Sequence, residues 1–343
     1  MTSSAPGVTI VVPVYNGAKH LRECLDSLVN QTWRHRDILV MDDASTDETP
    51  RIVEGYGKQV DVVRQVRNRG QFQNVEDGIA RARGRYVAVY HADDVYDPEI
   101  VAREVAFLEA HPDVGTVFCL DRFLDEAGRE YGRLTLPASL RGRTILDYPT
   151  VLNGILEFKN VFLPTPGAMA RIDCYRAVGG FRTEFGSAAD LDMWLRLARH
   201  SPVGVLEEHL FGYRHSAGSQ GQSYQALRTD PENYFAVMAR HLDENPRAVV
   251  TPVARRAHAA HRAVDHLRAA VNGYILGRLD RGRSAWRAVR VRDLLGSRRI
   301  RRPRHLVLWV VLGILFVLPR LPAAAHLLHW RYYRRLPWWA ASA

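Results

Sequence analysis

The sequence predicts an α/β protein with a mostly parallel sheet between layers of helices, followed by a basic helical extension at the C-terminal end. Three observations lead to this prediction. Strand-like and helix-like patterns alternate over residues 8–120, polar residues follow the ends of predicted strands, and arginine becomes frequent after about residue 231. A βαβ order implies parallel strands that are joined by right-handed crossovers.

The alternation begins with the apolar run VTIVVPVY (8–15), which is typical of a strand covered on both faces. The segment 18–31 then repeats leucine at helical spacing. The helix predicted next is capped by Ser45 or Thr46. The predicted elements are a strand at 8–15, a helix at 18–31, a strand at 37–43, a helix at 45–56, a strand at 60–66, a helix at 71–83 and a strand at 86–94.

Polar pairs follow three of these strands. They are Tyr15-Asn16, Asp42-Asp43 and Asp93-Asp94. Ligands of open α/β sheets bind beyond the carboxyl ends of the strands, where such residues meet. An acidic pair at a strand end can hold a divalent cation through oxygen ligands, while an isolated pair is also common in turns. The three pairs together predict one binding site.

We expect three parts in the chain. Residues 1–120 form the first half of an α/β domain, residues 121–230 its second half, and residues 231–343 an Arg-rich helical, membrane-associating extension. The three cysteines are far apart and form no CxxC pair, which argues against a zinc ribbon or a disulfide framework and indicates a reducing compartment.

The extension carries most of the positive charge. Between Arg247 and Arg335 there are 20 arginines and three acidic residues, about +17, so the rest of a chain of net charge +10 sums to about −7. The apolar run Leu306–Leu318 has 13 residues, fewer than the roughly 20 that span a bilayer as a helix. We expect this region to bind an anionic membrane surface. The run itself could span the membrane, lie on it, or be a buried helix. Nucleic acid is excluded as a partner, because the aromatic residues cluster with the aliphatic run and do not interleave with the arginines.

Four motifs carry a resemblance to a known family. VVPVYN, VMDDASTDET, NRG with GIARARGRYVAVYHADD, and GGFRTEF with AADLDMWLRL resemble, in order and spacing, the inverting family 2 glycosyltransferases, which have the GT-A nucleotide-sugar fold. The resemblance covers about residues 8–215 and says little about the basic extension. It implies that residues 1–120 are the nucleotide-sugar-binding half of a GT-A domain and residues 121–230 the acceptor-binding half with the catalytic base.

The resemblance implies a role for each matching residue. Pro13, Tyr15 and Asn16 match the loop that lies along the nucleotide, Asp42 the carboxylate that binds the base, and Asp43 the support of that turn. Asn68 and Gly70 match the turn that flanks the nucleotide, and Asp94 lies beside the diphosphate. Asp93 matches the ligand of a divalent cation, Mn²⁺ or Mg²⁺, and Asp190 the general base.

Three positions depart from the family pattern. His91 occupies the first position of the DxD motif, where aspartate is usual, and imidazole can still bind a metal. Ala189 replaces the glutamate that normally precedes the base. His215 lies one residue early relative to a family histidine, and it is a candidate metal ligand together with His91.

The predicted function is inverting transfer of a sugar from a nucleotide-diphosphate sugar, best matched by a UDP-sugar, to a glycan or lipid-linked hydroxyl. We expect this reaction in bacterial surface-polysaccharide assembly, at the cytoplasmic face of the membrane, with the protein peripheral or anchored by residues 306–318. Two alternatives stay open. One is a polyprenyl-phosphate glycosyl synthase, whose anionic acceptor needs no base. The other is a non-catalytic membrane-bound scaffold that keeps the GT-A fold.

Overall fold

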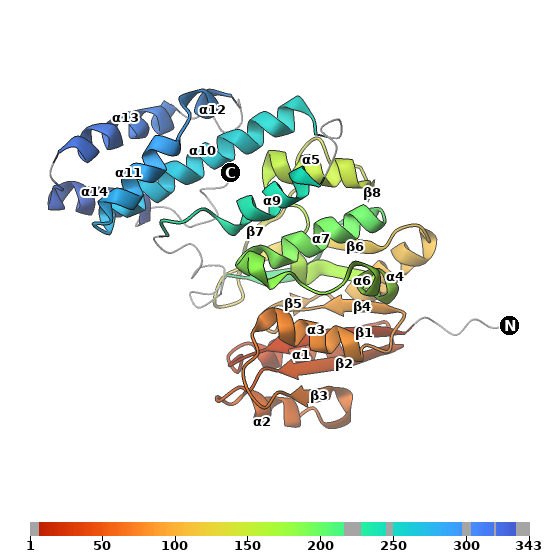
Figure 1. Ribbon diagram of the computed structural model, residues 1–343. Coiled ribbons are helices and arrows are strands. Elements are labelled where there is room, and N and C mark those ends of the chain that lie inside the picture. Colours follow the sequence, from red (N-terminus) through yellow and green to blue (C-terminus); the bar gives the residue numbers. More distant parts are fainter. Residues whose placement is uncertain (1–6, 216–227, 245–249, 297–302, 319, 334–343) are drawn as a thin grey trace. The chain divides into compact units, whose positions relative to one another are not determined.

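The computed structural model describes residues 7–215, 228–244, 250–296, 303–318 and 320–333 (Figure 1). The chain forms two compact units. One comprises Met1–Ile155 and Lys159–Ser216, and the other comprises Leu156–Phe158 and Ala217–Ala343. The boundary predicted at residue 120 lies inside the first unit, and the three predicted domain ranges stay predictions.

The first half of the sheet in the first unit is parallel, as predicted. Its strand order is β3-β2-β1-β4, and β1 pairs in parallel with both β2 and β4. These strands are β1 (Val8–Val14), β2 (Arg36–Asp42), β3 (Asp61–Arg64) and β4 (Tyr86–Val89). The connecting helices are α1 (Leu21–Val29), α2 (Thr49–Glu54) and α3 (Gln71–Arg81). The βαβ pattern therefore predicted the correct pairing over this region.

The second half of the sheet is mixed. Here β9 (Ala168–Arg171) runs antiparallel between β4 and β6 (Thr116–Leu124), and β10 (Val203–Arg214) runs parallel to β6. The short strands are β5 (Val95–Tyr96), β7 (Glu130–Arg133) and β8 (Ile145–Leu146), which pair antiparallel with β10, β6 and β10 respectively. Because β9 is antiparallel to both of its neighbours, it joins the two parallel groups and brings β10 into the same sheet.

Helices cover both faces of the parallel half. On one face Ile10 and Val12 pack with Leu21 and Leu25 of α1 in a buried apolar cluster. On the other face α3 lies close to β1, and a Cβ added at Gly78 would meet Val11 Cγ1 at 2.5 Å. The continuous apolar run of β1 is thus buried on both faces, which the sequence predicted. The remaining helices of this unit are α4 (Ile100–Ala110), α5 (Tyr148–Phe158, whose last residues belong to the second unit), α6 (Ile172–Val178) and α7 (Ala189–His200).

The second unit is helical, as expected for the C-terminal extension. Its helices are α9 (Asn233–Asp243), α10 (Pro252–Ile275), α11 (Leu279–Ala288), α12 (Val291–Leu295), α13 (Pro303–Val317) and α14 (Pro322–Tyr333). Helices α10 and α11 approach closely through glycines, since a Cβ at Gly273 would lie 2.6 Å from Gly282 Cα. Among the residues that the structure describes, no helix combines the length and the apolar character needed to cross a membrane.

A buried carboxyl group lies on α4, beneath the sheet. Glu104 is fully buried, and its Oε2 accepts a 2.6 Å hydrogen bond from the hydroxyl of Tyr90, which follows β4. Burial raises the pKa of Glu104 to about 8, and the bond from Tyr90 opposes this rise. The folded protein therefore keeps a proton on Glu104 that the unfolded chain releases at a pH near 4.5.

The first prediction concerns Glu104→Gln. Because the folded state binds the extra proton, this group lowers stability as the pH rises from about 4.5 to about 8, by roughly 1.4 kcal/mol per pH unit. Glutamine cannot ionise, so the variant should gain stability relative to the wild type across this window, measured by urea unfolding at several pH values. Glu99→Gln, at an exposed glutamate just before the same helix, is the control and should show no such trend. A constant difference between Glu104→Gln and the wild type would contradict the prediction.

Candidate active site

The carboxyl ends of the parallel strands meet at one edge of the sheet. Val14, at the end of β1, is opposite Asp42, at the end of β2. Backbone hydrogen bonds join the residues just beyond β2 and β4 to β1. Asp43 N donates to Val14 O (2.9 Å), and Tyr90 N donates to Val11 O (3.0 Å). The three polar pairs that the sequence indicated therefore follow strands that end at the same edge.

The loop after β1 is tied to the loop after β2 through Asn16. Its backbone N donates to Ser45 Oγ (2.9 Å), and its side-chain Oδ1 accepts from Thr46 N (2.8 Å). Asn16 has a φ of +50°, a left-handed conformation that asparagine tolerates better than most residues. Pro13 lies within β1, and the ring of Tyr15 is 52% exposed, so an aromatic surface is available above the loop.

Asp43 holds the turn before α3. Its two carboxylate oxygens accept hydrogen bonds from Arg69 N (2.7 Å) and Gly70 N (2.9 Å). Asn68 Oδ1 also accepts from Gly70 N (3.0 Å), and Gly70 has a φ of +86°, where glycine is favoured. The turn 68–70 is thus fixed to the end of β2.

Asp42 is buried beneath these loops. Its Oδ1 accepts from Ser45 N (2.9 Å), and its Oδ2 lies 3.4 Å from Arg64 Nε. Within the described part of the chain this Oδ2 has no hydrogen-bond partner. A buried polar atom of this kind needs an explanation, and a ligand that donates a hydrogen bond would supply it.

The turn after β4 gathers three potential metal ligands. Side-chain atoms of His91, Asp93 and Asp94 all lie within 4.8 Å of one another. The backbone of the turn is fixed by Tyr96, whose hydroxyl accepts from His91 N (2.6 Å). Asp94 N in turn donates to His91 O (3.3 Å).

Asp94 is held by Arg214 at the end of β10. Its Oδ1 accepts from Arg214 N (2.8 Å), whereas its Oδ2 is buried with no hydrogen-bond partner among the described residues. Burial, and then the charge of Asp93, raise the pKa of Asp94 well above its usual value. Arg214 Nε also donates to Asp93 O (3.0 Å), and Arg214 Nη2 donates to Glu23 Oε2 (2.6 Å).

His91 completes a donor set that suits a divalent cation. Burial lowers the pKa of His91, against the opposing charges of Asp93 and Asp190, so the imidazole is neutral and keeps a lone pair. One imidazole nitrogen and two carboxylates fit a transition metal such as Mn²⁺ better than Mg²⁺, which prefers oxygen alone. The unpartnered Oδ2 of Asp94 is the observation that supports this fit.

Asp190 lies at the start of α7, within electrostatic reach of His91. Its Oδ2 accepts from Thr165 Oγ1 (2.9 Å), and its Oδ1 accepts from Leu191 N (2.7 Å). Burial raises the pKa of Asp190, while the Thr165 hydroxyl and the Leu191 N–H lower it. Trp194 Nε1 donates to Thr165 Oγ1 (3.1 Å) and thereby fixes the hydroxyl.

Four carboxylates lie near one tyrosine of β10. Burial raises the pKa of Tyr213, and the charges of Asp94, Asp93, Asp121 and Asp190 raise it further. Burial also raises the pKa of Asp121, on β6, to about 7. Residues from both halves of the sheet therefore converge on a single acidic site.

The chain resembles known proteins both in sequence and in fold. Residues 9–177 match the protein family described as Glycosyl transferase family 2. EpsE of Bacillus subtilis, whose name describes it as a glycosyltransferase, is 27% identical over 219 residues, 62% of this chain and 74% of EpsE. Two longer relatives, from Rickettsia felis and Rickettsia conorii, are 26% identical, and the match covers 34% of their length. The family match and these relatives support a family 2 glycosyltransferase.

Solved structures show the same fold as this chain. S. aureus TarS 1–349, in complex with UDP-GlcNAc, is 19% identical, with a TM-score of 0.60 and coverage of 91% of each chain. The mannosyltransferase PcManGT from Pyrobaculum calidifontis, in complex with GDP-Man and Mn²⁺, is 17% identical, with a TM-score of 0.55 and coverage of 97% of this chain and 89% of that chain. At these identities the likeness establishes the GT-A fold, which the sequence predicted.

His215 of the glycosyltransferase has aromatic surroundings. Its ring stacks on Phe123 with centroids 5.4 Å apart, and its Nδ1 is hydrogen-bonded to the Tyr131 hydroxyl. Burial lowers the pKa of His215 to about 4. In the described part of the chain the three-residue cluster at His91 does not include His215, and a metal role for it stays a prediction.

Asp192, the acidic neighbour of Asp190, has a structural partner. Its Oδ2 accepts from Arg196 Nε (2.8 Å), and Arg196 also donates to Val178 O (2.6 Å) and Gly180 O (2.7 Å). Asp192 therefore orients an arginine that holds the GGF loop, and it does not stand in for the glutamate that Ala189 replaces.

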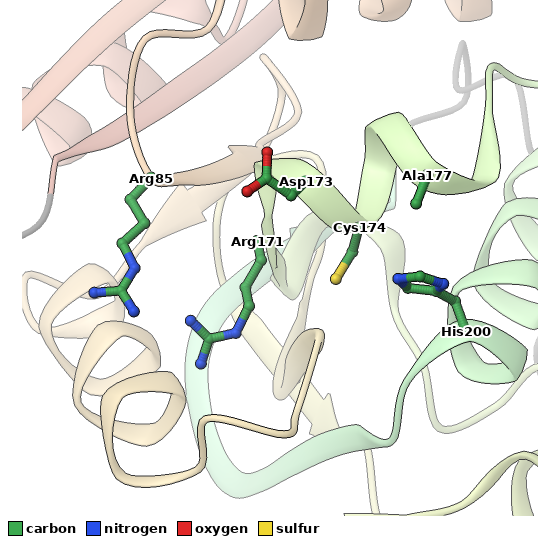
Figure 2. Close-up of a pocket in the computed structure, with 6 residues that line it drawn as sticks. All are labelled: Arg85, Arg171, Asp173, Cys174, Ala177 and His200. Carbon is green, nitrogen blue, oxygen red and sulfur yellow. The ribbon is translucent and has the colours of Figure 1, made fainter.

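A separate hollow lies at the opposite end of β4 (Figure 2). Its volume is about 420 Å³, and its lining residues are Arg85, Arg171, Asp173, Cys174, Ala177 and His200. Arg171 is occupied there, because its guanidinium donates to Val114 O (2.9 Å) and Leu108 O (2.6 Å). Arg85 pairs with Glu109 at 3.0 Å. These arginines therefore have partners within the fold.

Four residues of the site were not predicted from the sequence: Arg214, Thr165, Tyr96 and Tyr213. Arg214 had one usable signal, a single arginine at the end of the apolar strand 203–214. Thr165 and Tyr96 had none, because each acts through the fold on a residue far away in the chain.

The second prediction is that Arg214 sets the metal affinity of the turn. Arg214→Leu removes the donor to Asp93 O and leaves the half-exposed Glu23 to be solvated. Because partners of metal ligands contribute about 10–100-fold to affinity, Mn²⁺ binding should weaken by about tenfold in calorimetry. Arg129→Leu, which breaks the exposed pair with Asp125, is the matched control. Unchanged Mn²⁺ affinity in folded Arg214→Leu would refute this role.

Proposed function

We propose that this protein transfers a sugar of hexosyl type from a nucleotide-diphosphate sugar, UDP-linked by preference, to a hydroxyl of a glycan or lipid-linked acceptor. The transfer proceeds with inversion, and Asp190 is the general base. His91 forms a cluster with Asp93 and Asp94. The observation that carries the proposal is that Asp190 lies within electrostatic reach of this His91. A proton acceptor and a diphosphate site are thus adjacent.

The donor lies along the loops of the parallel half. Tyr15 offers an exposed ring to the nucleoside, and Asp42 has a buried Oδ2 that a base N–H can satisfy. The turn at Asn68 and Gly70, which Asp43 holds, flanks the nucleotide. Support for this donor class comes from TarS, which was solved with UDP-GlcNAc, and PcManGT, which was solved with GDP-Man.

His91, Asp93 and Asp94 hold the divalent cation, Mn²⁺ by preference over Mg²⁺. When bound, the cation neutralises the negative charge that develops on the leaving diphosphate. Asp94 is fixed in place by Arg214, and the backbone of His91 is fixed by Tyr96, so the ligands keep their spacing while the substrate enters and leaves.

Asp190 accepts the proton of the acceptor hydroxyl as its oxygen attacks the anomeric carbon. The bond between the new oxygen and this carbon forms on the face opposite the bond to the diphosphate, which breaks. A single displacement of this kind inverts the configuration and needs no carboxylate nucleophile. The hydrogen bonds from Thr165 and Leu191 favour the charged form of Asp190, which the base requires.

We place the reaction in the assembly of surface polysaccharide at the cytoplasmic face of a bacterial membrane. The acidic site would carry out the transfer, and the basic helical unit would bind the anionic membrane surface. Support for this setting is the charge contrast along the chain, about −7 before Arg247 and about +17 after it.

The third prediction tests the reaction with a panel of UDP-, GDP- and dTDP-sugars in Mn²⁺, with hydrolysis and thermal stabilisation as readouts. Asp93→Asn should abolish metal-dependent nucleotide binding. Asp190→Asn should keep that binding and lose about 10²–10⁴-fold in transfer to hydroxyl acceptors, the range of a general base. Asp173→Asn, at an exposed carboxylate in the first turn of α6, is the control and should keep both activities. Near-normal transfer by Asp190→Asn would favour a phosphate acceptor, and no metal-dependent binding by the wild type would favour a scaffold.

The fourth prediction concerns the pH profile of transfer. Thr165→Val removes a bond that lowers the pKa of Asp190, so this pKa rises and more of the base is protonated at a given pH. The acidic limb of kcat/KM should therefore move to higher pH, whereas Thr165→Ser, which keeps the hydroxyl, should leave it in place. If the acidic limb of kcat/KM lies at the same pH in Thr165→Val and Thr165→Ser, the Thr165 hydroxyl does not tune Asp190.

A further inference from the structure

Helix α13 has an apolar outward face. Val307, Val310, Val311, Ile314 and Val317 are between 39% and 86% exposed. Their spacing of three and four residues puts them on one side of the helix. Leu306 at one end, and Leu318 and Leu321 just beyond the other, are exposed as well. A run of aliphatic side chains of this size in water marks a surface that something else covers.

The opposite face of α13 is packed within the second unit. Leu308, Leu312 and Phe316, four residues apart, belong to a buried cluster with residues of α10. Trp309 stacks on Trp286 of α11 with ring centroids 5.4 Å apart, and Trp286 Nε1 donates to Trp309 O (2.9 Å). The helix is therefore fixed to its unit by one face, and the other face cannot be explained as part of the core.

The chain segment that contains α13 is rich in arginine. Between Arg278 and Arg335 the chain has fifteen arginines and two acidic residues. Arg287, Arg290, Arg304 and Arg331 are exposed, and within the described residues none of them forms an ion pair. Arg304 lies in the first turn of α13, and Arg320 follows three residues after its end.

We propose that α13 lies in the plane of an anionic bilayer surface. Its outward aliphatic residues enter the boundary between headgroups and acyl chains, and the neighbouring arginines bind lipid phosphates. In-plane binding fits the length of the helix. The apolar run of 13 residues extends over about 20 Å at 1.5 Å per residue, less than the roughly 30 Å of a hydrocarbon core.

The charge distribution selects this partner over others. A second copy of the chain would bring the same arginines to the interface, and like charges would oppose the contact. Nucleic acid would bind the arginines but leave the aliphatic face in water. An anionic membrane satisfies both features, because basic residues beside an apolar helix face are the elements of interfacial binding. The inference concerns the second unit and does not depend on the donor or acceptor of the proposed reaction.

The fifth prediction tests this surface by co-sedimentation of the full chain with vesicles. The wild type should bind vesicles that contain phosphatidylglycerol, bind pure phosphatidylcholine more weakly, and dissociate as salt is raised. Val310→Asp with Ile314→Asp should lower the partition coefficient for the anionic vesicles by at least tenfold. Val62→Asp with Val66→Asp adds the same two charges at exposed valines of the first unit and should retain binding.

Two results would overturn the proposal. One is equal binding by the two double variants, and the other is no binding of the wild type to anionic vesicles. Light scattering on the same samples tests whether a second copy covers the apolar face of α13. Conversion of an oligomer to a monomer by Val310→Asp with Ile314→Asp would show that it does and would count against the membrane. The assay contains no sugar nucleotide, so its outcome is separate from that of the transfer reaction.

Discussion

Like charges must be held together in this site, and the rest of the first unit is organised around that constraint. The charges of Asp93, Asp94, Asp121 and Asp190 all raise the pKa of Tyr213. Burial opposes ionisation of Asp94, Asp121 and Asp190, and the charges of Asp93 and Asp121 oppose that of Asp94 further. Backbone and side-chain donors offset part of this cost, since Arg214 N binds Asp94 and the Thr165 hydroxyl binds Asp190. The charge that these donors leave uncompensated is what makes the turn after β4 suitable for a cation.

The mixed sheet is the means by which these groups meet. The parallel half delivers the loops after β1 and β2 and the turn after β4 to one edge. The antiparallel β9 then joins β4 to β6, and β10 runs beside β6, so that Arg214 arrives at the turn after β4. The parallel group β3-β2-β1-β4 ends at β4, and the antiparallel β9 connects it to β6 and β10. The antiparallel insertion therefore places the second set of functional residues against the first.

The amino-acid sequence predicted the first half of this arrangement and not the second, for a physical reason. Strand periodicity and polar strand ends are local features, so the pairs at Asn16, Asp42 and Asp93 could be assigned to one edge from the order of residues alone. The strand β9 has only four residues after a Pro-Gly turn, and its direction depends on partners far away in the chain. Contacts such as Thr165 to Asp190 and Arg214 to Asp94 follow from that pairing, and sequence spacing carries no rule for them.

Two departures from the family pattern act in the same electrostatic direction. A third aspartate at position 91 would add a negative charge beside Asp93 and Asp190, whereas the neutral His91 ring supplies a lone pair without that repulsion. Ala189 likewise removes a carboxylate next to Asp190, and burial together with Thr165 then sets the protonation of Asp190. Both changes reduce the negative charge of a buried cluster, so the cation should be held less by the protein alone. A nucleotide diphosphate bound at this turn would supply further oxygen ligands and negative charge, so metal binding should depend strongly on nucleotide.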